Sequence, residues 1–166
     1  MRNSPARKIA FGGMFAALAM VIMNLGSLIP VATYVCPVLC MLILTFITRM
    51  CGNRIGWAWY GAVAILSLIM APDKEAAAVF CFLGFYPIVK PRFDALRFSW
   101  IPKLLLFNVL ILVMYWLLIW LLGMEQIGAE FAEMGRLLTI VMLIMGNAVF
   151  FLLDKVLDMC VIMGRR

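Results

Sequence analysis

The feature that most constrains this chain is a series of long apolar stretches with few or no charged residues. The first runs from Ile9 to Ile29. A membrane-spanning helix needs about 20 predominantly apolar residues, so this stretch is long enough to cross a bilayer. The rest of the chain has the same character, because 67% of its 166 residues are hydrophobic and only 13% are charged. The sequence therefore predicts an integral membrane protein with no separate soluble domain.

Charged residues, prolines and glycines divide the chain into six apolar stretches. Hydrocarbon offers no hydrogen-bond partner to an open strand or loop, so each stretch is expected to form a helix. The expected helices cover about residues 9–29, 35–48, 55–71, 76–89, 101–123 and 137–157. The predicted fold class is an all-α integral membrane protein, with six transmembrane helices in one compact bundle that forms a single domain over residues 1–166.

The positions of the basic residues predict the orientation of this bundle. Lys and Arg in short loops concentrate on the cytoplasmic side of a membrane. If six spans start from a cytoplasmic N-terminus, only Lys74 and Arg136 of the 14 basic residues fall outside. The inner set is Arg2, Arg7, Lys8, Arg49, Arg54, Lys90, Arg92, Arg97, Lys103, Lys155, Arg165 and Arg166. Losing one span would scatter these residues over both sides, so both termini are predicted to be cytoplasmic.

Several kinds of chemistry lack the residues they need. The chain has no His, which is the commonest general base and zinc ligand, and no G-x-x-x-x-G-K-[ST] phosphate loop. Its five cysteines lack the C-x-x-C spacing of a zinc or redox site. We therefore expect no enzyme activity, no metal site, no cofactor and no nucleic-acid partner, since topology accounts for the net charge of +6. A weaker alternative is a lipid-modifying enzyme in which Asp73 and Glu75 bind a metal and a headgroup.

Small residues recur at a spacing of four along the first helix. The pairs are Ala6 with Ala10, Gly12 with Ala16, and Gly13 with Ala17. Small side chains let two helix backbones approach closely in lipid, where there is little hydrophobic drive between helices. Two interpretations stay open: the strip packs against another helix of the same bundle, or it docks on a different subunit.

The stretch "ARKIAFGGMFAALAMVIMNLGSLIP", the Pro-containing first outer loop and the six short helices resemble the substrate-binding S components of energy-coupling factor (ECF) vitamin transporters. The resemblance implies a multi-pass protein of the bacterial cell membrane. It also implies that the first helix docks on a transmembrane coupling subunit, which two cytoplasmic ATPases drive. The positions that match the docking motif are Ala6 with Ala10, or Gly13 with Ala17. The outer loops that would close the substrate site correspond to residues 26–34, 72–75 and 124–135.

Four polar residues are candidates for binding a small-molecule ligand: Asn24, Ser27, Tyr34 and Asn147. The first three lie near the outer end of the first hairpin, and Asn147 lies near the middle of the last span. For Asn147, and for Asn108 in the fifth span, a hydrogen bond between helices is the alternative to a ligand contact. Asp154, Lys155 and Asp158 are expected to form a solvated charge cluster near the inner end of the last helix.

The same features fit a second class of function. A non-transporting membrane scaffold of the envelope-assembly kind would also have six helices, a small-residue strip and a basic inner loop that binds other proteins. Such a scaffold would have a filled core without an outward-facing cavity.

Overall fold

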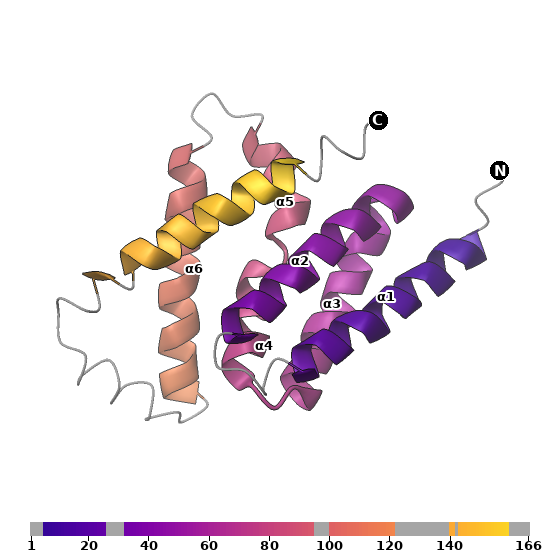
Figure 1. Cartoon of the computed structure of the whole chain (residues 1–166), viewed down its shortest axis with the longest axis horizontal. Coiled ribbons are helices and arrows are strands. Elements are labelled where there is room, and N and C mark those ends of the chain that lie inside the picture. The colour runs from indigo at the N-terminus through magenta and orange to yellow at the C-terminus, as the bar shows by residue number, and fades with distance from the viewer. Residues whose placement is uncertain (1–4, 26–31, 95–99, 122–139, 142, 160–166) are drawn as a thin grey trace. The chain divides into compact units, whose positions relative to one another are not determined.

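The computed structural model describes residues 5–25, 32–94, 100–121, 140–141 and 143–159, and every regular element among them is a helix (Figure 1). The labelled helices are α1 (Pro5–Leu25), α2 (Ala32–Cys51), α3 (Asn53–Met70), α4 (Lys74–Leu83), α5 (Tyr86–Asp94) and α6 (Trp100–Leu121). Residues 143–159 are also helical, and we call them the C-terminal helix. The all-α prediction is confirmed. Ser27 and the outer segment 124–135 lie outside the described residues.

Four helical segments in the described part of the chain are long and apolar enough to cross a membrane. They are Ala6–Leu25, Thr33–Cys51, Lys74–Asp94 and Trp100–Trp120. This agrees with a membrane protein. The helix α3 is not among the four, because Asn53, Arg54 and several aromatic residues in its first half lower its mean hydropathy. Six spans and a cytoplasmic position of both termini stay predictions.

The fourth apolar stretch is two helices rather than the one predicted over residues 76–89. The break lies at Gly84 and Phe85, where the Gly84 amide donates a hydrogen bond to the Phe80 carbonyl at 2.7 Å. A side chain at Gly84 would crowd Tyr60, whose Cε2 atom lies 3.0 Å from the position of a Cβ. Glycine therefore lets the aromatic ring of α3 pack against the backbone where the helix breaks. Pro87 lies in the first turn of α5, a position at which its missing N–H costs little.

The chain divides into two compact units, Met1–Arg97 and Phe98–Arg166. In the first unit, α2 is the central helix and packs against α1, α3, α4 and α5. Its buried face carries Cys40, Met41, Leu44 and Ile47. Among the described residues, every buried side-chain nitrogen and oxygen has a hydrogen-bond partner, as hydrocarbon requires.

The second unit contains α6 and the C-terminal helix, which cross obliquely (Figure 1) and run in opposite senses along their contact. Contacts between them join Asn108 to Asn147 and Lys103 to Asp154, so positions rise along one helix as they fall along the other. Phe107 and Phe150 stack between these two contacts, with ring centroids 4.5 Å apart. The two helices therefore form a hairpin that polar pairs and aromatic packing hold together.

Two glycines of α3 test the packing of α2 on α3. A Cβ at Gly56 would lie 2.5 Å from Thr48 Oγ1, an atom that donates to the Leu44 carbonyl at 2.8 Å. Gly56→Ala should therefore displace Thr48 and lower the free energy of unfolding by about 1–3 kcal/mol. Gly61→Ala is the matched control, because a Cβ there meets no described atom within 4 Å. It should be neutral or stabilise the helix by up to about 1 kcal/mol.

Unfolding of the purified protein in mixed micelles, titrated with a denaturing detergent, measures both changes. Equal effects of Gly56→Ala and Gly61→Ala would contradict the close α2–α3 contact.

Candidate functional site

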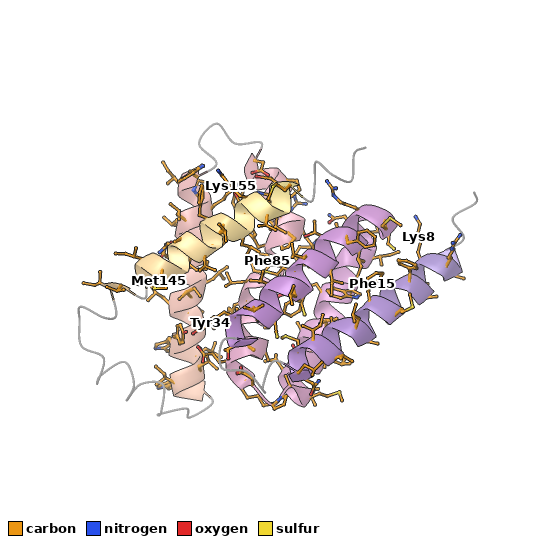
Figure 2. The ribbon with its side chains drawn as sticks, in the orientation of Figure 1. Lys8, Phe15, Tyr34, Phe85, Met145 and Lys155 are labelled. Carbon is orange, nitrogen blue, oxygen red and sulfur yellow. The ribbon has the colours of Figure 1, made fainter. Side chains whose placement is uncertain are left out.

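The two small-residue rows of α1 have different surroundings. Gly12 is buried, and its carbonyl oxygen accepts a hydrogen bond of 3.1 Å from the indole Nε1 of Trp59 on α3. Further along the same side, Ala19 is fully buried, and its carbonyl lies 3.7 Å from Cys40 Sγ. Phe15, labelled in Figure 2, contacts Phe46 of α2 with ring centroids 5.7 Å apart. Gly12 therefore packs inside the first unit, and Ala16, the other member of its row, is half-buried.

The other row faces away from these helices. Ala6, Ala10, Gly13 and Ala17 are all exposed. A Cβ built at Gly13 meets no described atom within 4 Å, whereas one built at Gly12 meets Ile55 Cγ2 at 3.9 Å. Successive residues of a helix point 100° apart, so burying Gly12 turns Gly13 out of the contact. We call Ala6, Ala10, Gly13 and Ala17 the exposed small face of α1.

The exposed small face of α1 differs from most of the exposed surface of α3 and α6, although α3 also exposes Ala58 and Ala62. Exposed positions of α3 and α6 carry large apolar side chains, such as Ile65, Ile69, Leu105 and Leu112. At the centre of a spanning helix, Leu or Ile favours insertion by about 0.3–0.6 kcal/mol per residue. Alanine and glycine contribute little of this insertion free energy. What they offer instead is a smooth surface on which another backbone can lie closely.

The end of the first unit that is predicted to lie outside brings together polar residues from distant parts of the sequence. The Tyr34 hydroxyl, on α2 (Figure 2), donates to Glu75 Oε1 at 2.9 Å. The neighbouring Thr33 hydroxyl donates to Asp73 Oδ2 at 2.7 Å. Two residues at the start of α2 thus bind two residues at the start of α4. Asn24 lies at the exposed end of α1, where its Nδ2 donates to the Met20 carbonyl at 2.8 Å.

Asp73 has a structural role in this cluster. Its Oδ1 atom accepts hydrogen bonds from the backbone amides of Glu75 and Ala76 at 3.0 and 3.1 Å, so Asp73 caps the N-terminus of α4. Both carboxylate oxygens of Asp73 therefore have partners. In the described ranges, no group of three or more His, Cys, Asp or Glu residues could hold a metal ion. The arrangement is a polar bridge between α2 and α4, made by Thr33, Tyr34, Asp73 and Glu75, and we call it the outer bridge.

Asn147 lies in the second unit, where it pairs with Asn108 of α6. The Asn108 amide donates to Asn147 Oδ1 at 3.0 Å, and the Asn147 amide donates to Asn108 Oδ1 at 3.2 Å. Each amide also donates to a carbonyl four residues earlier on its own helix, Leu104 or Leu143, at 2.8 Å. Both N–H donors of each amide are thus used. The hydrogen bond between helices, predicted as the alternative for Asn147, is confirmed.

The charged residues near the end of the C-terminal helix differ from the predicted solvated cluster. Asp154 accepts two hydrogen bonds from Lys103 Nζ, at 3.0 and 3.3 Å, and only 7% of the Lys103 side chain and 14% of the Asp154 side chain are exposed. The expectation of a solvated Asp154 is therefore wrong. Lys103, which the charge count places in a loop, lies in the first turn of α6 and is buried. Sequence reasoning missed the pair because its members are 51 residues apart. Of the three residues in the predicted cluster, Lys155 and Asp158 are exposed and Asp154 is not.

No protein-family model matches the chain, and neither the curated proteins nor the solved structures include a significant match.

The amide pair can be tested with a double-mutant cycle. Asn147→Leu should destabilise the protein, because it leaves the half-buried amide of Asn108 without its partner. Asn108→Leu combined with Asn147→Leu should cost less than the sum of the two single changes, by about 0.6 and at most about 1.7 kcal/mol. Unfolding in mixed micelles measures each variant.

Met145→Leu supplies the control for this cycle, because Met145 is exposed on the same helix (Figure 2). Combined with Asn108→Leu, it should give an additive effect. Additivity of the Asn108 and Asn147 substitutions as well would contradict the reciprocal hydrogen bonds.

Proposed function

We propose that this chain is the substrate-binding membrane subunit of an ECF-type micronutrient importer in the bacterial cell membrane. In this proposal, the subunit captures a small molecule at its outer end. The exposed small face of α1 then docks on a transmembrane coupling subunit, which two cytoplasmic ATPases drive. The chain itself has no phosphate loop, so the energy for import comes from those ATPases.

One observation carries the proposal: in the first unit Gly12 of α1 is buried and Ala16 is half-buried, whereas Ala6, Ala10, Gly13 and Ala17 are exposed. If the small residues served only to pack α1 within its own unit, the Gly12 row would suffice. Four small residues on a second side of the helix have no use in that packing. They would have a use if a helix of another protein packed closely against this side of α1, backbone to backbone.

The outer bridge supports a ligand site at the outer end of the first unit. Tyr34 and Thr33 follow the segment 26–31, which corresponds to the first closing loop of an S component. Through Glu75 and Asp73 they connect that loop to the start of α4. A ligand bound below these loops would therefore meet polar groups from both. Asn24 and Tyr34 remain our candidate ligand contacts, together with Ser27, whereas the Asn147 amide already serves the contact with α6.

A scaffold for envelope assembly is the second candidate, and the same exposed small face favours it, because any membrane protein partner could use that surface. The two functions differ in what accompanies the chain. An importer subunit carries a small molecule and associates with ATPases through the coupling subunit. A scaffold associates with membrane proteins alone and carries no ligand.

Co-purification from the native host in a mild detergent distinguishes these functions. We expect mass spectrometry to identify a coupling membrane protein and two ATPases, and a vitamin-sized molecule to be released on denaturation. Gly13→Leu and Ala17→Leu should each reduce the recovered ATPases at least about tenfold, because a bulky side chain keeps the partner helix at a distance. Neither change should alter the stability of the isolated chain.

Ala62→Leu is the matched control, since Ala62 is an exposed alanine of similar setting on α3. It should leave the association intact. Recovery of partners without ATPases or ligand would favour the scaffold, and full association of the Gly13→Leu and Ala17→Leu variants would contradict docking through the exposed small face.

A further inference from the structure

The hairpin of the second unit contains a pocket that the proposed function does not use. Its volume is about 130 Å³, and its lining residues are Trp100, Lys103, Leu104, Asn147, Phe150, Phe151 and Asp154. At about 30 Å³ per water, this is room for about four water molecules or a group of that bulk. Pockets for drug-sized ligands occupy about 300–1,000 Å³, so a whole vitamin does not fit.

The charges of the pocket select a particular kind of group. One ammonium, of Lys103, and one carboxylate, of Asp154, lie 3.0 Å apart in its wall. A simple anion would be repelled by Asp154, and a simple cation would be repelled by Lys103. A group that carries both charges can place its cation at Asp154 and its anion at Lys103. The pocket therefore favours a zwitterion.

The surroundings of the ion pair add to this selectivity. The rings of Trp100, Phe150 and Phe151 line the pocket, and aromatic faces attract ammonium groups. Lys155 does not line the pocket, and its Nζ lies 5.4 Å from the centroid of the Phe151 ring. One carboxylate beside aromatic rings, and one ammonium group, match an ammonium joined to an anionic group such as a phosphate.

The place of the pocket along the helices favours a lipid as the source of this group. Lys103 lies three residues into α6, about 4.5 Å from its start, which is the depth of headgroups rather than of the bilayer centre. Trp100 is 59% exposed at that end, as tryptophans at a membrane interface are. Next to the pocket, α6 exposes Ile101 and Leu105, along which an acyl chain can lie.

We infer that the α6 hairpin binds the headgroup of a zwitterionic phospholipid, with its ammonium at Asp154 and its phosphate at Lys103. Phosphatidylethanolamine has this chemistry. All residues of the site belong to the second unit, whereas the exposed small face of α1 and the outer bridge belong to the first, so the inference does not depend on the proposed transport function.

Native mass spectrometry of the full chain, titrated with defined lipids in detergent, tests the site. We expect phosphatidylethanolamine to bind at least about tenfold more tightly than phosphatidylglycerol, which has the phosphate but no ammonium. Asp154→Asn should remove this preference. Asp158→Asn should keep it, because Asp158 is exposed one turn further along and does not line the pocket.

Two further measurements keep the test decisive if Asp154→Asn fails to fold. Leu104→Trp fills the pocket without changing its charge, and it should lower the affinity for phosphatidylethanolamine about tenfold. Free phosphoethanolamine should not compete at concentrations comparable to those of the lipid. The inference would be overturned if the two lipids bound equally, or if Asp154→Asn and Asp158→Asn lost the lipid preference equally. Competition by free phosphoethanolamine at matched concentration would also overturn it, because the pocket would then belong to a soluble zwitterion.

Discussion

The hydrogen bond from the Trp59 indole to the Gly12 carbonyl sets the orientation of α1 on the first unit. Lipid gives helices little hydrophobic reason to associate, so their contacts depend on close packing and on hydrogen bonds between them. Gly12 permits both, because it has no side chain to hold Trp59 away from the backbone and because a carbonyl oxygen can accept a second hydrogen bond. Once Gly12 is turned inward, the 100° step of the helix turns Gly13 outward. The exposed small face is thus a consequence of how α1 packs.

Different interactions hold the helices together in the two units. The first unit uses small residues, sulfur atoms and aromatic rings around α2, with the outer bridge joining the starts of α2 and α4. The second unit uses two polar pairs, the Asn108–Asn147 amides and the Lys103–Asp154 ions. Its neutral pair lies deeper along α6, and its ion pair lies near the end of the helix. This order fits the cost of burying charge, which falls toward the membrane surface.

Much of the helical architecture could be predicted from the sequence, because apolar runs and charged breaks are local signals. The close approach of Tyr60 to Gly84 could not, since that ring comes from another helix. The same limit applies to the candidate sites. A spacing of four showed that Gly12 and Gly13 each belong to a small-residue row, but only the position of Trp59 shows which row is buried. Likewise, Lys103 and Asp154 are far apart in sequence, and nothing local to either residue reveals that they pair.

The central claim is that the exposed small face of α1 lies against a helix of another protein in the native membrane. Photo-cross-linking in intact cells, from a photoreactive amino acid placed at Ala17, tests it most directly, with Ile65 on the exposed side of α3 as the reference position. The account predicts a covalent adduct with a distinct membrane protein from position 17 and only lipid adducts from position 65. Lipid adducts alone from position 17, or a cross-link from it to the second unit of the same chain, would contradict the account.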